Sequence, residues 1–226
     1  MSTVICPRMF LKKEIQIPRR VIKDLKEVSA ISCRARWEYA GHVKTFKMMR
    51  GDHFVFGKST RVTSKDRSSV DLDTVINVWP SLVSYHTHPC VTVPSPIKHD
   101  TTIFVTLPSN CDFEAYIKGY PEMQVNIICD THGYYVVDLI SAAERGYLPF
   151  PRVVNIVMND FRKRKDIQDM HFSEEGLEYF STDLNTWKNI INHELGAVLN
   201  DLFGITIRYF GYDDESPIVS LDLDSI

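Results

Sequence analysis

The chain has 226 residues and a formal net charge of −3, and its hydrophobic fraction of 44% and charged fraction of 24% are ordinary for a globular protein. The negative net charge excludes a protein that attracts nucleic acid through a strong positive field. The sequence lacks the run of about 18 apolar residues that indicates a membrane span, and residues 1–10 lack the apolar stretch of a signal peptide. We therefore expect no nucleic-acid partner and no membrane partner.

Five cysteines are scattered along the chain without a CxxC pair: Cys6, Cys33, Cys90, Cys111 and Cys129. An odd number of dispersed cysteines predicts reduced thiols, as in a cytoplasmic or nuclear protein. Cys90 and Cys111 lie close to the motifs described below, so their contact with a functional site is left open.

The N-terminal part of the chain predicts strands and one amphipathic helix. A strand is expected over 14–17, a helix over 19–32, a strand over 37–49 and its hairpin partner over 53–56, with the turn at 51–52. Val21, Leu25 and Val28 form an apolar face of the helix because they are three or four residues apart. The polar segment 58–69 is interpreted as an exposed loop, with a mobile flap as the alternative.

The middle of the chain predicts further strands and a short helix. A strand over 81–85 leads into His86, a strand is expected over 101–107, and a helix over 112–120 is ended by Pro121. Two more strands are expected over 125–129 and 134–140.

The composition changes near Pro149, and helices are expected from there on, over 153–163 and 182–203. Gly204 ends the second helix, and apolar residues at helical spacing mark its buried face: Leu184, Trp187, Ile191, Leu195, Val198 and Leu202. This face packs on its own domain or serves a protein partner. The tail over 213–226 is either an edge strand or a disordered end.

This order of elements predicts a mixed α/β (α+β) fold with a central mixed β-sheet flanked by helices. We expect residues 1–148 to form one domain and residues 149–226 to form a helical C-terminal extension with a short strand or tail.

His86 and His88 alternate with Thr87 at the end of a predicted strand. Residues i and i+2 of an extended chain project to the same face, about 7 Å apart along the backbone, so both imidazoles can reach one metal ion. The alternative is a pair of surface or hydrogen-bonded core histidines.

Ser109 and Asp112 open the predicted helix that follows Pro108. In one interpretation Ser109 is the N-cap and Asp112 only favours the helix dipole. In the other, the rigidly placed Asp112 carboxylate is a third metal ligand. Two histidines, one aspartate and a water form the open tetrahedral arrangement of catalytic zinc.

Glu38 lies at the start of a predicted strand, where a solvated or paired carboxylate is the ordinary interpretation. A hydrolytic zinc site also needs one carboxylate that is not a ligand, because a proton must pass from water to the leaving amine.

Together, Glu-x-x-Gly at 38–41, His-x-His-Pro at 86–89 and Ser-x-x-Asp at 109–112 resemble the JAMM motif. This motif marks the metal-dependent isopeptidases and deubiquitinases built on the MPN (JAB) domain, and the resemblance covers about residues 11 to 145. It implies an MPN-like fold, a Zn²⁺ ion bound by His86, His88 and Asp112, Glu38 as general base and Ser109 as the group that stabilises the oxyanion.

The chain departs from the family in the length of the segment between His-x-His-Pro and Ser-x-x-Asp, which has nineteen residues, 90–108. We interpret this segment as an insertion that borders the active-site groove. Ser95 and Asp100 lie closer to the histidines, but four residues separate them, so one helical turn would not present both. Asp112 is therefore preferred as the ligand, and His99 and Asp100 remain reserve candidates.

The resemblance predicts a zinc metallopeptidase that hydrolyses peptide or isopeptide bonds, with a ubiquitin-like conjugate or a peptide as substrate. The second hypothesis is a non-catalytic MPN-type interaction module, which the presence of every expected site residue disfavours. A thiol enzyme using Cys111 is a third and weaker hypothesis, because no activating base can be assigned to it from the sequence.

Overall fold

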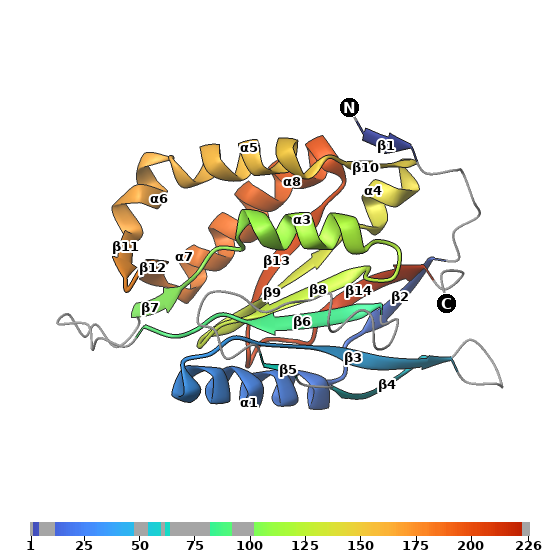
Figure 1. Ribbon diagram of the computed structural model, residues 1–226, viewed down its shortest axis with the longest axis horizontal. Helices are drawn as coiled ribbons and strands as arrows, with labels where there is room; N and C mark the ends of the chain where they lie inside the picture. Colours follow the sequence, from blue (N-terminus) through green and yellow to red (C-terminus); the bar gives the residue numbers. More distant parts are fainter. Residues whose placement is uncertain are drawn as a thin grey trace.

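The computed structural model describes residues 2–4, 12–47, 54–59, 62–63, 82–91 and 102–222. Helices cover both faces of a mixed central sheet (Figure 1), so the predicted mixed α/β class is confirmed. The predicted turn at 51–52, most of the segment 58–69 and the reserve candidates Ser95, His99 and Asp100 lie outside the described residues.

The central sheet has the strand order β13-β9-β8-β6-β3-β4, and β5 also pairs with β3. Only β6 and β8 are parallel among these pairs, and α3 lies between them in the chain. The bounds are β3 (Tyr39–Lys47), β4 (Phe54–Ser59), β5 (Val62–Thr63), β6 (Val83–Thr87), β8 (Val125–Cys129), β9 (Gly133–Asp138) and β13 (Thr206–Gly211).

Three small antiparallel sheets surround the central one and join distant parts of the chain. They are β1 (Ser2–Val4) with β10 (Tyr147–Pro149), β2 (Lys12–Gln16) with β14 (Ile218–Asp222), and β11 (His171–Glu174) with β12 (Leu177–Asp183) and β7 (Thr102–Val105). The tail is thus a strand as far as Asp222, which was one of the two alternatives left open.

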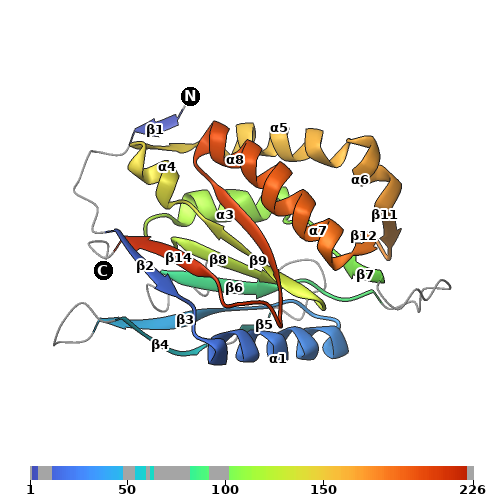
Figure 2. The same ribbon diagram turned by 180° about the vertical axis from the view of Figure 1, so that it is seen from behind.

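One face of the sheet is covered by α1 (Arg19–Ala35) (Figure 2). The predicted apolar face of this helix is confirmed, because Val21, Leu25 and Val28 are buried in one cluster with Tyr85 of β6 and Ile127 of β8. Strand residues of the opposite parity therefore face away from α1.

The other face carries most of the remaining helices and a separate core cluster that includes Phe113, Tyr116 and Trp187. These helices are α3 (Asn110–Gly119), α4 (Ile140–Glu144), α5 (Pro151–Arg162), α6 (Lys165–Met170), α7 (Leu184–Asn189), the π-helical segment η1 (Ile190–Leu195) and α8 (Gly196–Phe203). None of the helices in the described ranges is both long enough and apolar enough for a membrane span.

The C-terminal segment has more strands than the helical extension with a short strand or tail that the sequence predicts. It holds four strands as well as helices, and one of them, β13, pairs with β9 along its whole length at the edge of the central sheet. Residues from both sides of position 148 share one core cluster. Strand β13 was missed because half-buried residues alternate with buried ones over only six positions.

The predicted apolar face of the 182–203 helix is correct in its first part and wrong in its last. Trp187, Ile191 and Leu195 are buried, but Val198 and Leu202 are 45% and 53% exposed, and Leu199 is buried instead. The cause is the π-helical segment, because its wider turn rotates the following α-helix relative to the core.

Gly204 ends this helix as predicted, in the left-handed conformation with φ 68°. A Cβ atom there would lie 2.6 Å from the backbone nitrogen of Ala142, so both the conformation and the close approach require glycine.

The prediction of reduced thiols is wrong for one pair, since Cys33 and Cys90 form a disulfide with their Cα atoms 5.0 Å apart. Cys111 and Cys129 are free. The pairing joins the end of α1 to the segment after β6, and no local pattern indicates that these segments are neighbours.

Candidate metal centre

Strand β6 presents its residues alternately to the two faces of the sheet. The Thr87 hydroxyl donates to the hydroxyl of Ser32 in α1 at 2.8 Å, so Thr87 faces α1. His86 pairs in register with Ala40, a residue of the opposite core cluster, and therefore faces α3. Alternation places His86 and His88 on one side, as the sequence predicts.

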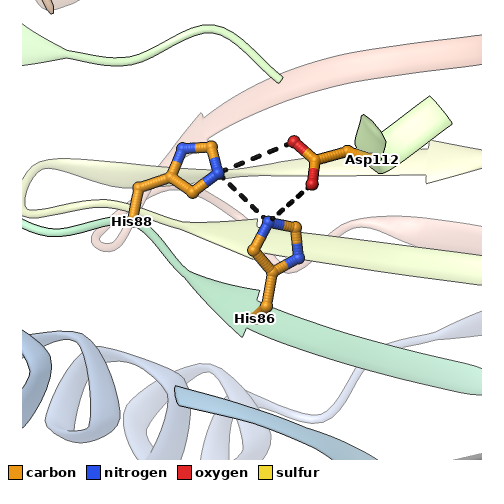
Figure 3. A group of neighbouring side chains, drawn as sticks. All are labelled: His86, His88 and Asp112. Atoms are coloured by element: carbon orange, nitrogen blue, oxygen red, sulfur yellow. Dashed lines mark hydrogen bonds and ion pairs between the residues drawn. The ribbon is translucent and has the colours of Figure 1, made fainter. Parts of the chain in front are cut away.

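Asp112 completes a group of three buried or half-buried side chains whose ligand atoms lie within 4.8 Å of one another. His86 Nε2 lies 3.1 Å from His88 Nε2 and 3.4 Å from Asp112 Oδ1, and His88 Nε2 lies 3.7 Å from Asp112 Oδ2. Figure 3 shows the two rings converging on the carboxylate that α3 supplies. The three predicted ligands are therefore brought together.

His86, His88 and Asp112 could hold a metal ion, because one ligand atom from each residue lies within 4.8 Å of the others. Each histidine nitrogen faces a different oxygen of the Asp112 carboxylate. Three protein ligands would leave a fourth tetrahedral position to solvent or substrate.

The carboxylate of Asp112 is held by the start of its own helix. Its Oδ2 accepts a hydrogen bond from the Ser109 N–H at 2.6 Å, and the Ser109 Oγ accepts one from the Asp112 N–H at 3.1 Å. These two bonds form a capping box, so Ser109 is the N-cap, as in the first interpretation of Ser-x-x-Asp. The same Asp112 carboxylate also faces both histidines. The two interpretations are therefore compatible.

Each histidine uses its second ring nitrogen for a buried hydroxyl. His86 Nδ1 lies 3.3 Å from the Tyr116 hydroxyl, and His88 Nδ1 lies 2.5 Å from the Thr106 hydroxyl. A hydroxyl on Nδ1 orients the ring and leaves Nε2 for the metal. Sequence reasoning missed Thr106 and Tyr116, because neither belongs to a motif.

Burial and mutual charge shift the pKa values of the three candidate ligands. Burial lowers the pKa of His86 to about 4, against the opposing effect of Asp112. Burial also acts to lower the pKa of His88, but its hydrogen bond to Asp112 and nearby negative charges outweigh it and raise that pKa. Burial opposes ionisation of Asp112, yet the two histidines hold its pKa well below the ordinary value. A neutral His86 and an ionised Asp112 are the forms that bind metal.

Glu38 lies beside this group and is 7% exposed. It precedes β3 by one residue and Ala40, the partner of His86, by two. Its negative charge is one of those that raise the pKa of His88, after the effects of burial and of Asp112. Glu38 is not in the group of three whose ligand atoms converge, and its role as general base stays a prediction.

The described end of the 90–108 segment borders the site, as predicted, because Thr106 contacts His88. Residues 92–101 lie outside the described residues. Cys111 is exposed, and neither it nor Cys90, which is in the disulfide, belongs to the converging group.

Arg162 of α5 braces the start of α3. Its guanidinium donates to the carbonyl of Pro108 at 2.5 Å and to the side-chain oxygen of Asn110 at 3.0 Å. Arg162 is therefore hydrogen-bonded to the residues on either side of Ser109. Asp112 therefore depends on the C-terminal segment as well as on its own cap. The sequence offers no signal for this contact.

Comparison with known proteins adds no relative: no protein-family model, no curated protein and no solved structure matches this chain.

Proposed function

We propose that this chain is a zinc-dependent hydrolase of the JAMM type that cleaves isopeptide or peptide bonds. The observation that carries the proposal is that ligand atoms of His86, His88 and Asp112 all lie within 4.8 Å of one another. Two imidazoles and one carboxylate with an open position are the donor set of catalytic zinc sites. Ubiquitin or ubiquitin-like conjugates are the substrate class that the resemblance implies.

Zinc is proposed over iron, which also binds two histidines and one carboxylate in some enzymes. Octahedral coordination at about 2.1 Å would bring neighbouring ligand atoms to about 3.0 Å, and tetrahedral coordination to about 3.3 Å. The two histidine nitrogens are 3.1 Å apart, between these two values, so the choice of zinc rests on the resemblance to the JAMM motif.

The zinc ion, when bound, would lower the pKa of water to about 7 and polarise the scissile carbonyl. Glu38 accepts a proton from the attacking water and passes it to the leaving amine, so amide and water become carboxylate and amine. Ser109 uses a lone pair of its hydroxyl for the cap, and its O–H can donate to the oxyanion.

The test uses the purified chain, its metal content by mass spectrometry, and hydrolysis of lysine-linked diubiquitin and of a peptide substrate. The wild type should hold one zinc ion per chain and should cleave at least one of the two substrates. Glu38→Gln should keep the zinc and lose about 10²- to 10⁴-fold in rate, because an amide cannot accept the proton. Glu122→Gln, at an exposed position, serves as the control and should change neither quantity.

Loss of zinc in Glu38→Gln would make Glu38 a ligand and overturn the proposed mechanism. Bound iron instead of zinc would overturn the choice of metal. Stoichiometric zinc without hydrolysis would favour the non-catalytic MPN-type module, for which the exposed Val198 and Leu202 of α8 are candidate partner contacts.

A further inference from the structure

Buried hydrogen bonds connect Trp187 of helix α7 to His88 through Tyr135 and Thr106. The Trp187 Nε1–H donates to the Tyr135 hydroxyl at 2.8 Å, and that hydroxyl donates to the backbone carbonyl of Thr106 at 2.5 Å. The Thr106 hydroxyl then lies 2.5 Å from His88 Nδ1. Trp187 and Tyr135 are fully buried, so water does not compete for these bonds.

The direction of the first two bonds follows from the groups themselves. An indole N–H can only donate, so the Tyr135 oxygen accepts from Trp187. The single proton of Tyr135 is then left for the Thr106 carbonyl. These two hydrogen bonds hold the Thr106 backbone in one place, and the donor and acceptor in each of them cannot be exchanged.

The pairing of β12 with β7 also holds the backbone next to Thr106. Phe180 of β12 pairs with Val105, the residue before Thr106, and its ring stacks on Trp187 with the ring centroids 5.4 Å apart. Three C-terminal or sheet residues thus converge on the backbone at the end of β7.

We propose that Thr106 is the positioning residue that holds the His88 ring with Nε2 toward His86 and Asp112, and that Tyr135 and Trp187 keep Thr106 in place. This inference rests on the proposed metal site. The Thr106 hydroxyl lies 2.5 Å from His88 Nδ1, so Nε2 is the ring nitrogen that faces His86 and Asp112. Without that hydroxyl, Nδ1 would be a buried polar atom that has lost its partner, and the ring would no longer be held in this orientation.

Thr106→Val removes the hydroxyl with little change of shape, and Thr106→Ser keeps it. Zinc affinity, measured by competition with a chelator, should fall about 10- to 100-fold in the valine variant and be retained in the serine variant. Thr102→Val is the matched control, because it makes the same substitution at the other end of β7. Calorimetry of each variant separates loss of fold from loss of affinity.

A second measurement does not involve the metal. In the metal-free protein labelled with ¹⁵N-histidine, the Nδ1 resonance of His88 should be that of a hydrogen-bonded ring nitrogen by NMR. Thr106→Val should shift that resonance, and Thr106→Ser should not. A valine variant with unchanged zinc affinity and an unchanged His88 signal would overturn the proposal.

Tyr135→Phe tests whether the hydrogen bond from Tyr135 keeps Thr106 in place. It also tests the proposal if Thr106→Val does not fold. It should weaken zinc binding while the Thr106 hydroxyl is still present. A lower melting temperature with unaltered zinc affinity and His88 signal would show that Tyr135 and Trp187 are structural only. If the wild type bound no zinc, the proposed function would fail, and the His88 signal would still decide whether Thr106 holds the His88 ring.

Discussion

Ser109 and Asp112 are joined by two reciprocal hydrogen bonds, and the carboxylate that closes this capping box is the one that faces the two histidines. A local helix-start motif therefore positions a candidate metal ligand. Rigid placement on a helix end limits the conformational entropy that binding would otherwise remove.

Ser109 has two roles that substitutions can separate. Ser109→Gly should cost only a few tenths of a kcal/mol of stability, because glycine is an acceptable N-cap, whereas Ser109→Ala should cost about 1 kcal/mol. If the hydroxyl also stabilises the oxyanion, both variants should lose about 10²- to 10³-fold in kcat while retaining zinc. Thermal unfolding and kinetics measure the two effects. Near-normal kcat in Ser109→Gly would leave Ser109 with the cap alone.

Asp112 rather than Asp100 is expected to bind the metal. Asp112→Ala should abolish stoichiometric zinc, because the two histidines would be left without a third ligand, and Asp100→Ala should leave it bound. Metal analysis of both variants decides between them. The opposite result would move the site into the segment before β7 and make Ser95 the oxyanion candidate.

Arg162 is expected to matter for metal binding from outside the ligand set. Arg162→Ala removes the brace on both sides of Ser109, so zinc affinity should fall about 10-fold as the start of α3 loosens. Arg162→Lys should restore little, because an ammonium cannot span both acceptors in the same fork. The exposed neighbour Lys163→Ala is the control for the loss of one positive charge. Equal zinc affinity in all three variants would contradict the bracing role.

Asp138 should make the stability of the protein depend on pH. Burial raises the pKa of this carboxyl to about 6, although Arg208 opposes the shift, whereas the unfolded value is about 3.9. A raised pKa means that the folded state binds the proton more tightly, so the contribution to stability is present below about pH 4 and lost as the pH rises through about 6.

The measurement compares urea unfolding of wild type and Asp138→Asn between pH 4 and pH 7. The asparagine variant should gain about 2 to 3 kcal/mol relative to the wild type across that window, since asparagine has no charge to desolvate. The exposed Asp169→Asn should show no such gain. A stability difference that does not change with pH would rule out this role for Asp138.

Much of the fold was predictable because its signals are local. The apolar spacing of α1, the short strands around the histidines and the glycine stop at Gly204 depend on residues within one or two turns of each other. The ends of the helices and strands that were predicted differ from the prediction by a few residues, whereas β1, β10, β11, β12 and α4 were not predicted. The rotation caused by η1 was not predictable in this way, because the π turn depends on how the helix packs against the sheet.

By itself the sequence determined the candidate ligands. His86 and His88 share a face because side chains alternate along a strand, and Asp112 is held by a cap that begins three residues earlier. The tertiary structure alone decided what surrounds them: Thr106, Tyr116 and Arg162 reach the site from three separate elements. It also decided that β13 completes the central sheet and that Cys33 meets Cys90. These contacts join residues far apart in the chain, and a single sequence carries periodicity and caps but no record of which distant segments pack together.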